Sequence, residues 1–528
     1  MDLAASGRNW AIATPHALAS RAGARAFERG GNAIDAALAA ATTLAVVYPH
    51  MCGVGGDLFA VVHRPEGDTR AVNSSGRAPL AADPDALRAA HGSAMPLRGP
   101  DSITVPGAPA GWAALHRIGA ALPWSEAFDD ARVSAHDGVP LARDVASSLV
   151  EGEGAEVLVD DPALAGVFAP NGRPLAEGEE LRQPALGTTL DTLAAGGAEA
   201  LYRGPVGAAY VRGLRAAGSR ITESDLAGHE AYMAPPLVGA FAGGDIHLAV
   251  APPNSQGYSL LQSLAAIDRL GIDPDPHGPD AATLARIFLE GLRDVRRHLA
   301  DPERMAVHPS TLLEDGYLAA FCDAVRAPLV PGDAPARPSG DTIALVAMDA
   351  EGTAVSLVQS LFWAFGSGIL DPSTGIVAHN RGACFTLAPG LPNTYTPGAL
   401  PLHTLLPVLL LDQDRGLVGA AGTKGSFQQP QIDAQVIVHA FVRGRTPADA
   451  VAAPRWIVED LPDDGLPPIV AETDLPAPTI DALGGSGLAV QEVAARPSWV
   501  GHAHLVRRIG EEIHAGTDPR ADGAALAG

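Results

Sequence analysis

The sequence is poor in cysteine and lacks the features of a membrane segment. Its three cysteines, Cys52, Cys322 and Cys384, lie far apart without a CxxC pair, so we expect neither a disulfide framework nor a zinc site. The first residues have no basic flank leading into an apolar run, which argues against a secretory signal. The longest apolar stretch, residues 36–48, is shorter than the roughly 20 residues that a membrane span needs. We therefore expect a buried helix there, a cytoplasmic protein and no membrane partner.

Basic residues are also scarce. The chain of 528 residues has 36 Lys and Arg against 60 Asp and Glu, a net charge of −24. Such a charge repels the phosphates of nucleic acids and of anionic lipids, so nucleic acid is not expected as a partner. Hydrophobic residues make up 47% of the chain, which is typical of a globular enzyme.

Cofactor and metal motifs are incomplete. The segment GVGGDL, which begins at Gly53, lacks the last glycine of a dinucleotide-binding loop and follows an expected helix instead of a strand. His229 and Glu230 lack the second histidine of a zinc-protease helix, and no serine stands in a complete GxSxG elbow. We therefore expect no cofactor, no metal and no serine triad.

Local signals predict helices and strands near the start of the chain. Thr14 can cap an amphipathic helix, and Asn32 can cap an alanine-rich helix that Pro49 ends. We expect these two helices to come first and to be followed by strands at residues 58–63 and 70–72.

A second group of strands is expected late in the chain. The segment APLVPGDAPARPSGD, residues 327–341, has no periodicity and predicts an exposed, irregular loop. TIALVAMD and TAVSLVQS then form an expected hairpin, LLPVLLL and LVGAA form a second strand pair, and a helix runs from Gln429 to about Val442. Strands at both ends with helices between them predict an α+β fold, in which helices pack on antiparallel sheets.

Thr342 is the first residue of the expected hairpin. Threonine favours strands, so this position alone carries no functional meaning. Blocks along nearly the whole chain, however, resemble the gamma-glutamyltranspeptidase family. In the family's order and spacing, they are GGNAIDAALAAATTLAVVYPHMCGVGGDLFAVV, ITESDLAGHEAY, APPNSQGYSLLQ, GDTIALVAMDAEGTAVSLVQSLFWAFGSGIL, LPLHTLLPVLLL, AAGTKGSFQQPQ, APRWIV and GHAHLV.

The resemblance implies the four-layer αββα sandwich of the N-terminal nucleophile (Ntn) hydrolases, with two antiparallel sheets between layers of helices. It also implies that Thr342 attacks the carbonyl of Asp341 and cuts its own chain. Residues 1–341 would form a large subunit and residues 342–528 a small subunit, within one intertwined globular domain. The two subunits would form a heterodimer, and two such heterodimers could assemble into a dimer.

Cleavage would create the catalyst. The freed α-amine of Thr342, with a reference pKa of about 7.7–8.0, would take the proton from the hydroxyl of the same residue. The acyl-enzyme formed on Thr342 would then pass its acyl group to water or to an amine. The implied substrate is a small-molecule amide.

Three further catalytic residues are implied by the resemblance. Ser360 stands where the family has a second hydroxyl and would orient the α-amine. The alternative is that Ser360 is an ordinary serine at a strand end, without a catalytic role. Gly425 and Ser426 stand where the family has two glycines whose N–H groups bind the oxyanion. Ser426 can still donate its N–H if the turn does not demand a positive φ. Otherwise the segment is only a turn leading into the helix at Gln429.

The donor-binding positions depart from the family. The acidic residue that holds the donor amine falls at Cys384, and the arginine that binds its carboxylate falls at Ser75. Phe362 replaces an asparagine, and Arg381 replaces a glutamine. His403 and Thr404 replace a pair of serines. The candidate substrate-binding residues are Arg77, Asn380, Arg381, His403 and Thr404.

These changes predict an acyl group that carries a carboxylate and lacks an amine, because arginine pairs bidentately with carboxylates. Oxalyl or glutaryl amides would fit, as in the family's oxamate-hydrolase and cephalosporin-acylase relatives. The segment between Phe385 and Leu402 is shorter than many lids of the family, which favours hydrolysis over transfer. Three alternatives stay open: a true gamma-glutamyltransferase or glutathione hydrolase, an uncleaved non-catalytic relative, and arginines that only pair with surface acids.

Overall fold

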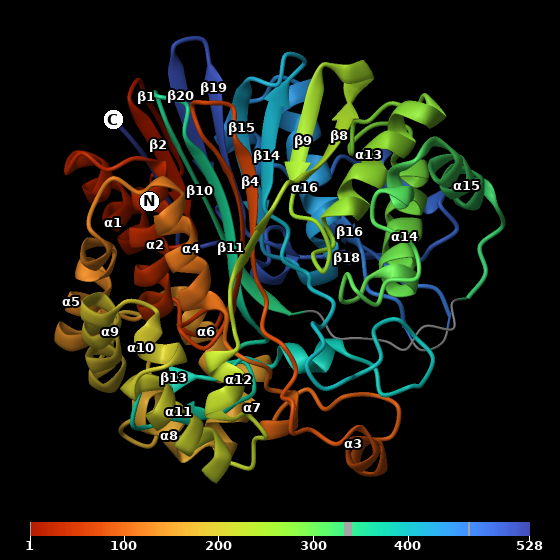
Figure 1. Cartoon of the computed structure of the whole chain (residues 1–528). Coiled ribbons are helices and arrows are strands. Elements are labelled where there is room, and N and C mark those ends of the chain that lie inside the picture. Colours follow the sequence, from red (N-terminus) through yellow and green to blue (C-terminus); the bar gives the residue numbers. More distant parts are fainter. Residues whose placement is uncertain (1, 332–339, 463–464) are drawn as a thin grey trace.

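The computed structural model describes residues 2–331, 340–462 and 465–528. Two seven-stranded antiparallel sheets lie face to face in its centre, and helices cover the outer face of each (Figure 1). The expected αββα sandwich is therefore confirmed. In spatial order, sheet I contains β21 (Ala524–Ala527), β2 (Trp10–Thr14), β10 (Asp341–Asp349), β11 (Ala354–Phe362), β3 (Asp57–His63), β4 (Thr69–Ser74) and β7 (Tyr232–Ala234). Sheet II contains β1 (Ala4–Gly7), β20 (Glu512–Thr517), β19 (Ala503–Ile509), β15 (Leu417–Thr423), β14 (Val408–Asp412), β9 (Ile246–Val250) and β8 (Leu237–Phe241).

Residues before and after position 341 contribute strands to both sheets. In sheet I, β10 lies between β2 of the N-terminal part and β11 of the C-terminal part. In sheet II, β14 of the C-terminal part pairs with β9 of the N-terminal part. A cut at residue 341 would therefore leave two chains joined by backbone hydrogen bonds and by shared cores.

Side chains alternate between two cores along β10, because successive side chains of a strand point to opposite faces. Ile343, Leu345 and Ala347 pack toward the helices that cover sheet I. Ala344, Val346 and Met348 pack between the two sheets. Each fully buried leucine or valine side chain contributes about 1.5–3 kcal/mol, so both faces of this strand fix its position firmly.

The outer helix layers explain the alanine-rich run near the start of the chain. Every residue of α2 (Ala33–Val47) is buried between sheet I and other helices, and small side chains allow that close packing. On this side lie α1 (Ala17–Glu28), α4 (Ala108–Gly119), α5 (Asp129–Asp137) and α9 (Pro184–Gly196). The layer on sheet II contains α13 (Gly257–Leu270), α14 (Ala281–His298), α16 (Gln429–Ile437) and α17 (Pro447–Ala452).

Most local expectations are confirmed. Asn32 caps α2 in a capping box with Asp35, and β10 pairs with β11 as β14 does with β15. The helix expected from Gln429 is α16, which continues as a π-helical turn over Val438–Val442.

Three local expectations need correction or lie beyond the described residues. Thr14 does not cap α1: it ends β2, and the His16 ring accepts from the N–H of Leu18 instead. Two strands, β1 and β2, precede the first helix, and the short, alanine-rich segments that form them gave no clear alternation. Of the loop expected before the hairpin, residues 332–339 lie outside the described part of the chain.

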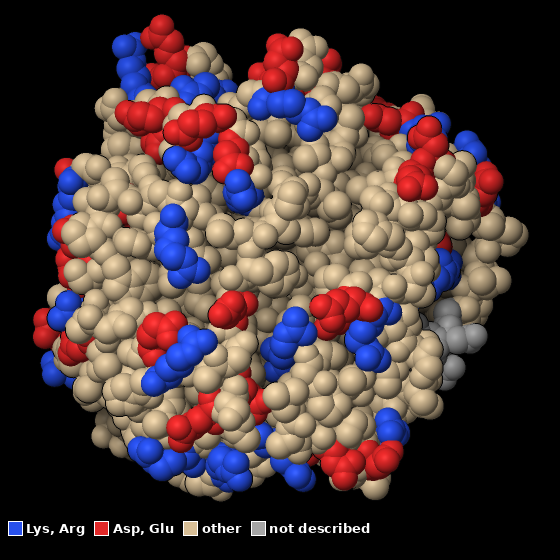
Figure 2. All heavy atoms as spheres, viewed as in Figure 1, with Lys and Arg blue, Asp and Glu red and all other residues tan. Residues whose placement is uncertain are grey.

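Charged side chains of both signs are interspersed over the face of the molecule in Figure 2, without a large area of one sign. Within the described residues, no helix is both long enough and apolar enough to cross a membrane.

Candidate active site

Thr342 lies at an irregularity in the pairing of β10 with β11. Asp341 faces Phe362, whereas Ile343 faces Gln359, so two residues of β11 lie opposite Thr342 alone. Such a bulge redirects side chains at the end of a strand. Thr342 is 1% exposed, so its hydroxyl is enclosed in the uncut chain.

Ser360, one of the two residues opposite Thr342, is hydrogen-bonded to both sides of the bond between Asp341 and Thr342. Its Oγ donates to the carbonyl oxygen of Asp341 at 2.7 Å and accepts from Oγ1 of Thr342 at 3.2 Å. The N–H of Phe362 also donates to this oxygen, at 2.7 Å. Since these donors occupy its lone pairs, the single proton of Ser360 is directed at the Asp341 carbonyl.

The backbone on either side of the Asp341–Thr342 bond is tightly constrained. Phe362, whose N–H donates to Ser360, has a φ of 80°, a left-handed conformation that is strained for a bulky residue. A Cβ on Gly340 would collide with the carbonyl of Phe362. Glycine is therefore required immediately before Asp341.

The turn after β15 contacts Asp341 through Lys424 and carries two backbone N–H groups at the next two residues, Gly425 and Ser426. Gly425 has a φ of 142° and Ser426 a φ of 49°. No hydrogen bond among the described residues uses either N–H group. Gln256 fixes the turn, because its Nε2 donates to the carbonyl oxygens of Ser426 and Thr404 at 2.7 Å each. The turn thus demands the positive φ that was expected to prevent donation by Ser426. Ser426 adopts this φ, which a second glycine would accept without strain, and its N–H still has no partner among the described residues, so it can donate.

Arg381 is a fully buried cation next to Ser360. Its side chain is 0% exposed, and one terminal nitrogen donates to Oγ of Ser360 at 3.3 Å. The other donates to Oγ1 of Thr404 at 3.0 Å and lies 3.7 Å from Sγ of Cys384. The guanidinium also stacks on the Phe362 ring at 4.3 Å. No Asp or Glu of the described residues forms an ion pair with Arg381, and its Nε has no partner there.

A buried carboxylate, Asp57, organises the far side of the site. It accepts from Nε2 of His403 at 3.0 Å and from the N–H of Gly76 at 3.0 Å. Burial raises the pKa of Asp57, but His379, His403 and Arg381 outweigh burial and hold that pKa below its ordinary value. Burial and Arg381 lower the pKa of His403 to about 3. The His403 ring is thus neutral and donates to a charged carboxylate.

Two other candidate substrate-binding residues, Asn380 and Arg77, do not contact Ser360 in the described structure. Asn380 accepts from the N–H of Trp363 and donates to the carbonyl of Leu97, so both ends of its amide are engaged. Arg77 lies 3.5 Å from Asp301, donates to a backbone carbonyl and is 47% exposed. Of the two arginines, only Arg381 contacts Ser360 in the described structure.

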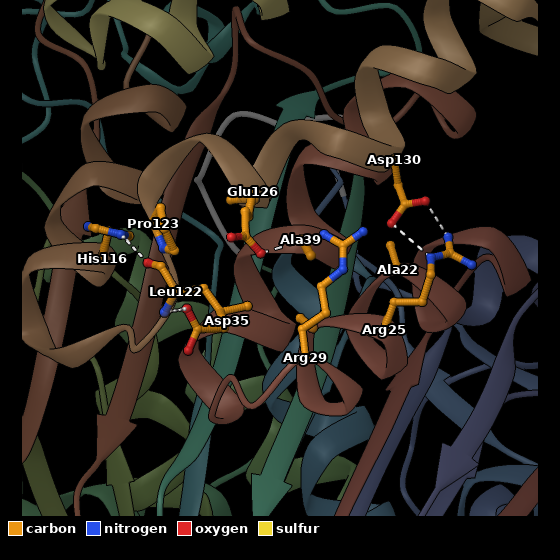
Figure 3. Close-up of a pocket in the computed structure, with 12 residues that line it drawn as sticks. Ala22, Arg25, Arg29, Asp35, Ala39, His116, Leu122, Pro123, Glu126 and Asp130 are labelled. Carbon is orange, nitrogen blue, oxygen red and sulfur yellow. Dashed lines mark hydrogen bonds and ion pairs between the residues drawn. The ribbon is translucent and has the colours of Figure 1, made fainter.

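The pocket drawn in Figure 3 lies elsewhere, between α1, α2 and the 3-10 turn Trp124–Phe128. Its charged groups satisfy one another. Arg25 pairs with Asp130, and Arg29 with Glu126. The N–H of Leu122 donates to Asp35. Its cavity of about 10 Å³ has barely the room that one water molecule needs, so it is not a substrate site.

Two residues that contact the site were missed from the sequence. Lys424 reaches the side chain of Asp341, and Asp57 holds His403. Lys424 could have been singled out from the sequence, because it is the only lysine among the 528 residues. Asp57 carried none, since its partner lies 346 positions away.

Comparisons with known proteins agree with this geometry. Residues 19–528 match the family described as Gamma-glutamyltranspeptidase. The chain is 32% identical to the glutathione hydrolase-like YwrD proenzyme of Bacillus subtilis, over 100% of both chains. It is 35% identical to the oxamate amidohydrolase proenzyme of Klebsiella pneumoniae, over 97% of each. Its structure matches the cephalosporin acylase of Bacillus halodurans with a TM-score of 0.88 and 29% identity, over 99% of this chain and 97% of that one.

The chain therefore belongs to the gamma-glutamyltranspeptidase family. Together with the αββα fold, this makes it an Ntn hydrolase or acyltransferase that is made as a proenzyme.

Proposed function

We propose that this proenzyme cuts itself between Asp341 and Thr342. The mature enzyme then hydrolyses amides of a small acyl group that carries a carboxylate and no amine. The observation that carries the second half of this proposal is the position of Arg381. A fully buried guanidinium without an acidic partner in the described residues is costly unless an anion compensates it, and it contacts the hydroxyl next to the nucleophile.

Self-cleavage begins with attack by Oγ1 of Thr342 on the carbonyl carbon of Asp341. The bond from that carbon to the Thr342 nitrogen breaks, the nitrogen takes up the proton, and an ester replaces the amide. Ser360 already donates to the oxygen on which negative charge develops, so it stabilises that charge without reorganisation. Water then hydrolyses the ester, which leaves a carboxylate on Asp341 and a free amine and hydroxyl on Thr342.

The mature reaction uses the same hydroxyl. The α-amine of Thr342, with a reference pKa of about 7.7–8.0, accepts the hydroxyl proton as Oγ1 attacks the donor carbonyl. The N–H groups of Gly425 and Ser426, which have no partner among the described residues, suit the oxyanion, because backbone donors in a buried turn are already oriented. Water releases the acyl group, and the two subunits stay together through the sheets that they share.

The surroundings of Arg381 disfavour a donor with an α-amine. Holding an ammonium group requires an acid, and the position expected to supply it is Cys384, whose Sγ lies 3.7 Å from the guanidinium. A donor ammonium at this place would meet a cation instead of an anion, and like charges repel strongly where water is excluded. A carboxylate at the same place is attracted.

Turnover of three anilides tests the proposal. Glutaryl, γ-glutamyl and butyryl p-nitroanilides differ only in whether they carry the carboxylate and the amine. We expect kcat/KM for the glutaryl compound to exceed both others by at least about tenfold, since a hydrogen bond to a charged group contributes about 1.5–3 kcal/mol. Preference for the γ-glutamyl compound would instead identify a true gamma-glutamyltransferase.

A further inference from the structure

Lys424 is the only lysine in the sequence, and the other 35 of its 36 basic residues are arginines. It lies in the turn between β15 and Gly425, and its side chain is only 4% exposed. Lysine is almost never buried without partners, because its ammonium group loses its water of hydration. The groups that contact this ammonium group therefore indicate the role of Lys424.

The ammonium group of Lys424 contacts the residue that is to be cut. Its Nζ lies 3.3 Å from Oδ1 of Asp341 and 3.4 Å from Oγ of Ser498. Ser498 in turn donates to Asp144 at 2.5 Å. Burial raises the pKa of Asp144, but Lys424 and His50 outweigh burial and hold that pKa well below its ordinary value. Asp144 and Ser498 thus keep the ammonium group in place, and the side chain of Asp341 is its direct anionic contact.

Asp341 is held at both ends of one acyl unit. Ser360 donates to its carbonyl oxygen, which belongs to the bond that Thr342 attacks, and Lys424 contacts its side-chain carboxylate. Two carbons, Cα and Cβ, separate the attacked carbonyl carbon from this carboxylate carbon. The same spacing occurs in a succinyl group.

We propose that Lys424 is the carboxylate-binding residue of the acyl site and acts twice. In the precursor it holds the side chain of Asp341 while Thr342 attacks. After cleavage has freed Asp341, it binds the carboxylate of a donor whose acyl group has succinyl spacing. This inference rests on the proposed function, in which one hydroxyl attacks both carbonyls. Arg381 acts at the other end, beside Ser360, where the carboxylate of the shorter oxalyl group would lie.

Because the chain has one lysine, amine labelling can follow it directly. Reductive methylation with formaldehyde and a borane, read by peptide mass spectrometry, compares the uncut Thr342→Ala precursor with the mature wild-type protein. We expect little methylation of Lys424 in the precursor, ready methylation in the mature enzyme, and protection by succinamate but not by butyramide. Denatured samples of both proteins define full labelling. Equal labelling of the two folded proteins, or no protection by succinamate, would overturn the proposal.

Donor kinetics provide a second test, with Lys424→Met and Lys424→Arg. We expect K424M to process more slowly and, once cut, to lose at least about tenfold in the ratio of kcat/KM for succinyl over butyryl p-nitroanilide. K424R should recover part of this ratio, because it restores a cation, and it replaces K424M for donor kinetics if K424M stays uncut. The ratio for oxalyl over butyryl anilide should change less. If K424M keeps the succinyl-over-butyryl ratio of the wild type, only the role of Lys424 is refuted. If the wild-type enzyme turns over no acyl anilide at all, the proposed function is refuted as well.

Discussion

Oγ of Ser360 lies 2.7 Å from the carbonyl oxygen of Asp341, the oxygen of the peptide bond that precedes Thr342. The contact joins two residues that lie 19 positions apart and are brought together by the bulge between β10 and β11. A donor is therefore in place at the oxygen that becomes negative when Thr342 attacks. The geometry prepares the uncut chain for cleavage at this bond.

Replacement of Ser360 should slow cleavage without unfolding the protein. Ser360→Ala removes the donor to Asp341, and loss of one such donor lowers a rate by about 10²–10³-fold. Ser360→Thr keeps the hydroxyl and serves as the matched control. The appearance of two fragments, followed over time by denaturing electrophoresis, measures the rate. Cleavage of S360A at the wild-type rate would show that the contact has no role.

Replacement of Arg381 should change donor preference and leave the fold intact. Arg381→Met removes a buried cation that forms no ion pair with an acid among the described residues, and with it the cost of burying an unpaired charge. We expect the kcat/KM ratio of oxalyl over butyryl anilide to fall about tenfold or more, with an unchanged or higher Tm. Arg77→Met, which removes the group paired with Asp301, should keep the wild-type ratio. A ratio that depends on Arg77 and not on Arg381 would contradict this assignment.

Replacement of Ser426 by glycine should stabilise the protein. A left-handed conformation costs an L-residue roughly 1–2 kcal/mol, and the buried Oγ of Ser426 has no partner among the described residues. After the entropy cost of glycine, about 0.5–1 kcal/mol, Ser426→Gly should stabilise the protein by about 0.5–1 kcal/mol. Ser426→Ala removes the same hydroxyl but keeps the strain, so it should be less stable than Ser426→Gly. Thermal unfolding compares the two variants, and a lower Tm for S426G than for S426A would refute the explanation.

Stability should fall on acidification below pH 6.5 because histidines are buried as neutral rings. Burial lowers the pKa of His504 to about 3, whereas an unfolded histidine titrates near about 6.5. Between these values the unfolded chain binds a proton that the native chain does not, so the free energy of unfolding falls by up to about 1.4 kcal/mol per pH unit for this group.

Urea unfolding from pH 7.5 to 5.0, in the Thr342→Ala background so that one covalent chain unfolds, measures this slope. His504→Asn removes the titrating ring and should make the slope shallower by about 1 kcal/mol per pH unit. An unchanged slope in this variant would show that His504 does not contribute.

Local strand and turn signals predicted the hairpin, whereas the αββα fold and the candidate nucleophile came from the resemblance of sequence blocks along the whole chain to a known family. Contacts between distant segments could not be read in the same way. Nothing in the pattern brings Asp57 to His403 or separates Arg381, which is buried, from Arg77, which pairs with Asp301. Backbone conformation was also hidden, since the positive φ of Ser426 follows from the turn that surrounds it. Lys424 is the exception, because a lone lysine among 36 basic residues was visible without a structure.

Intact-mass measurement of the purified protein tests the central claim most directly. The account predicts two chains for the wild type, the smaller beginning at Thr342. It predicts one uncut chain of 53.9 kDa for Thr342→Ala, and two chains again for Thr342→Ser, which keeps the hydroxyl. A wild-type protein that remains whole, or a Thr342→Ala variant that is still cut at the same bond, would contradict it.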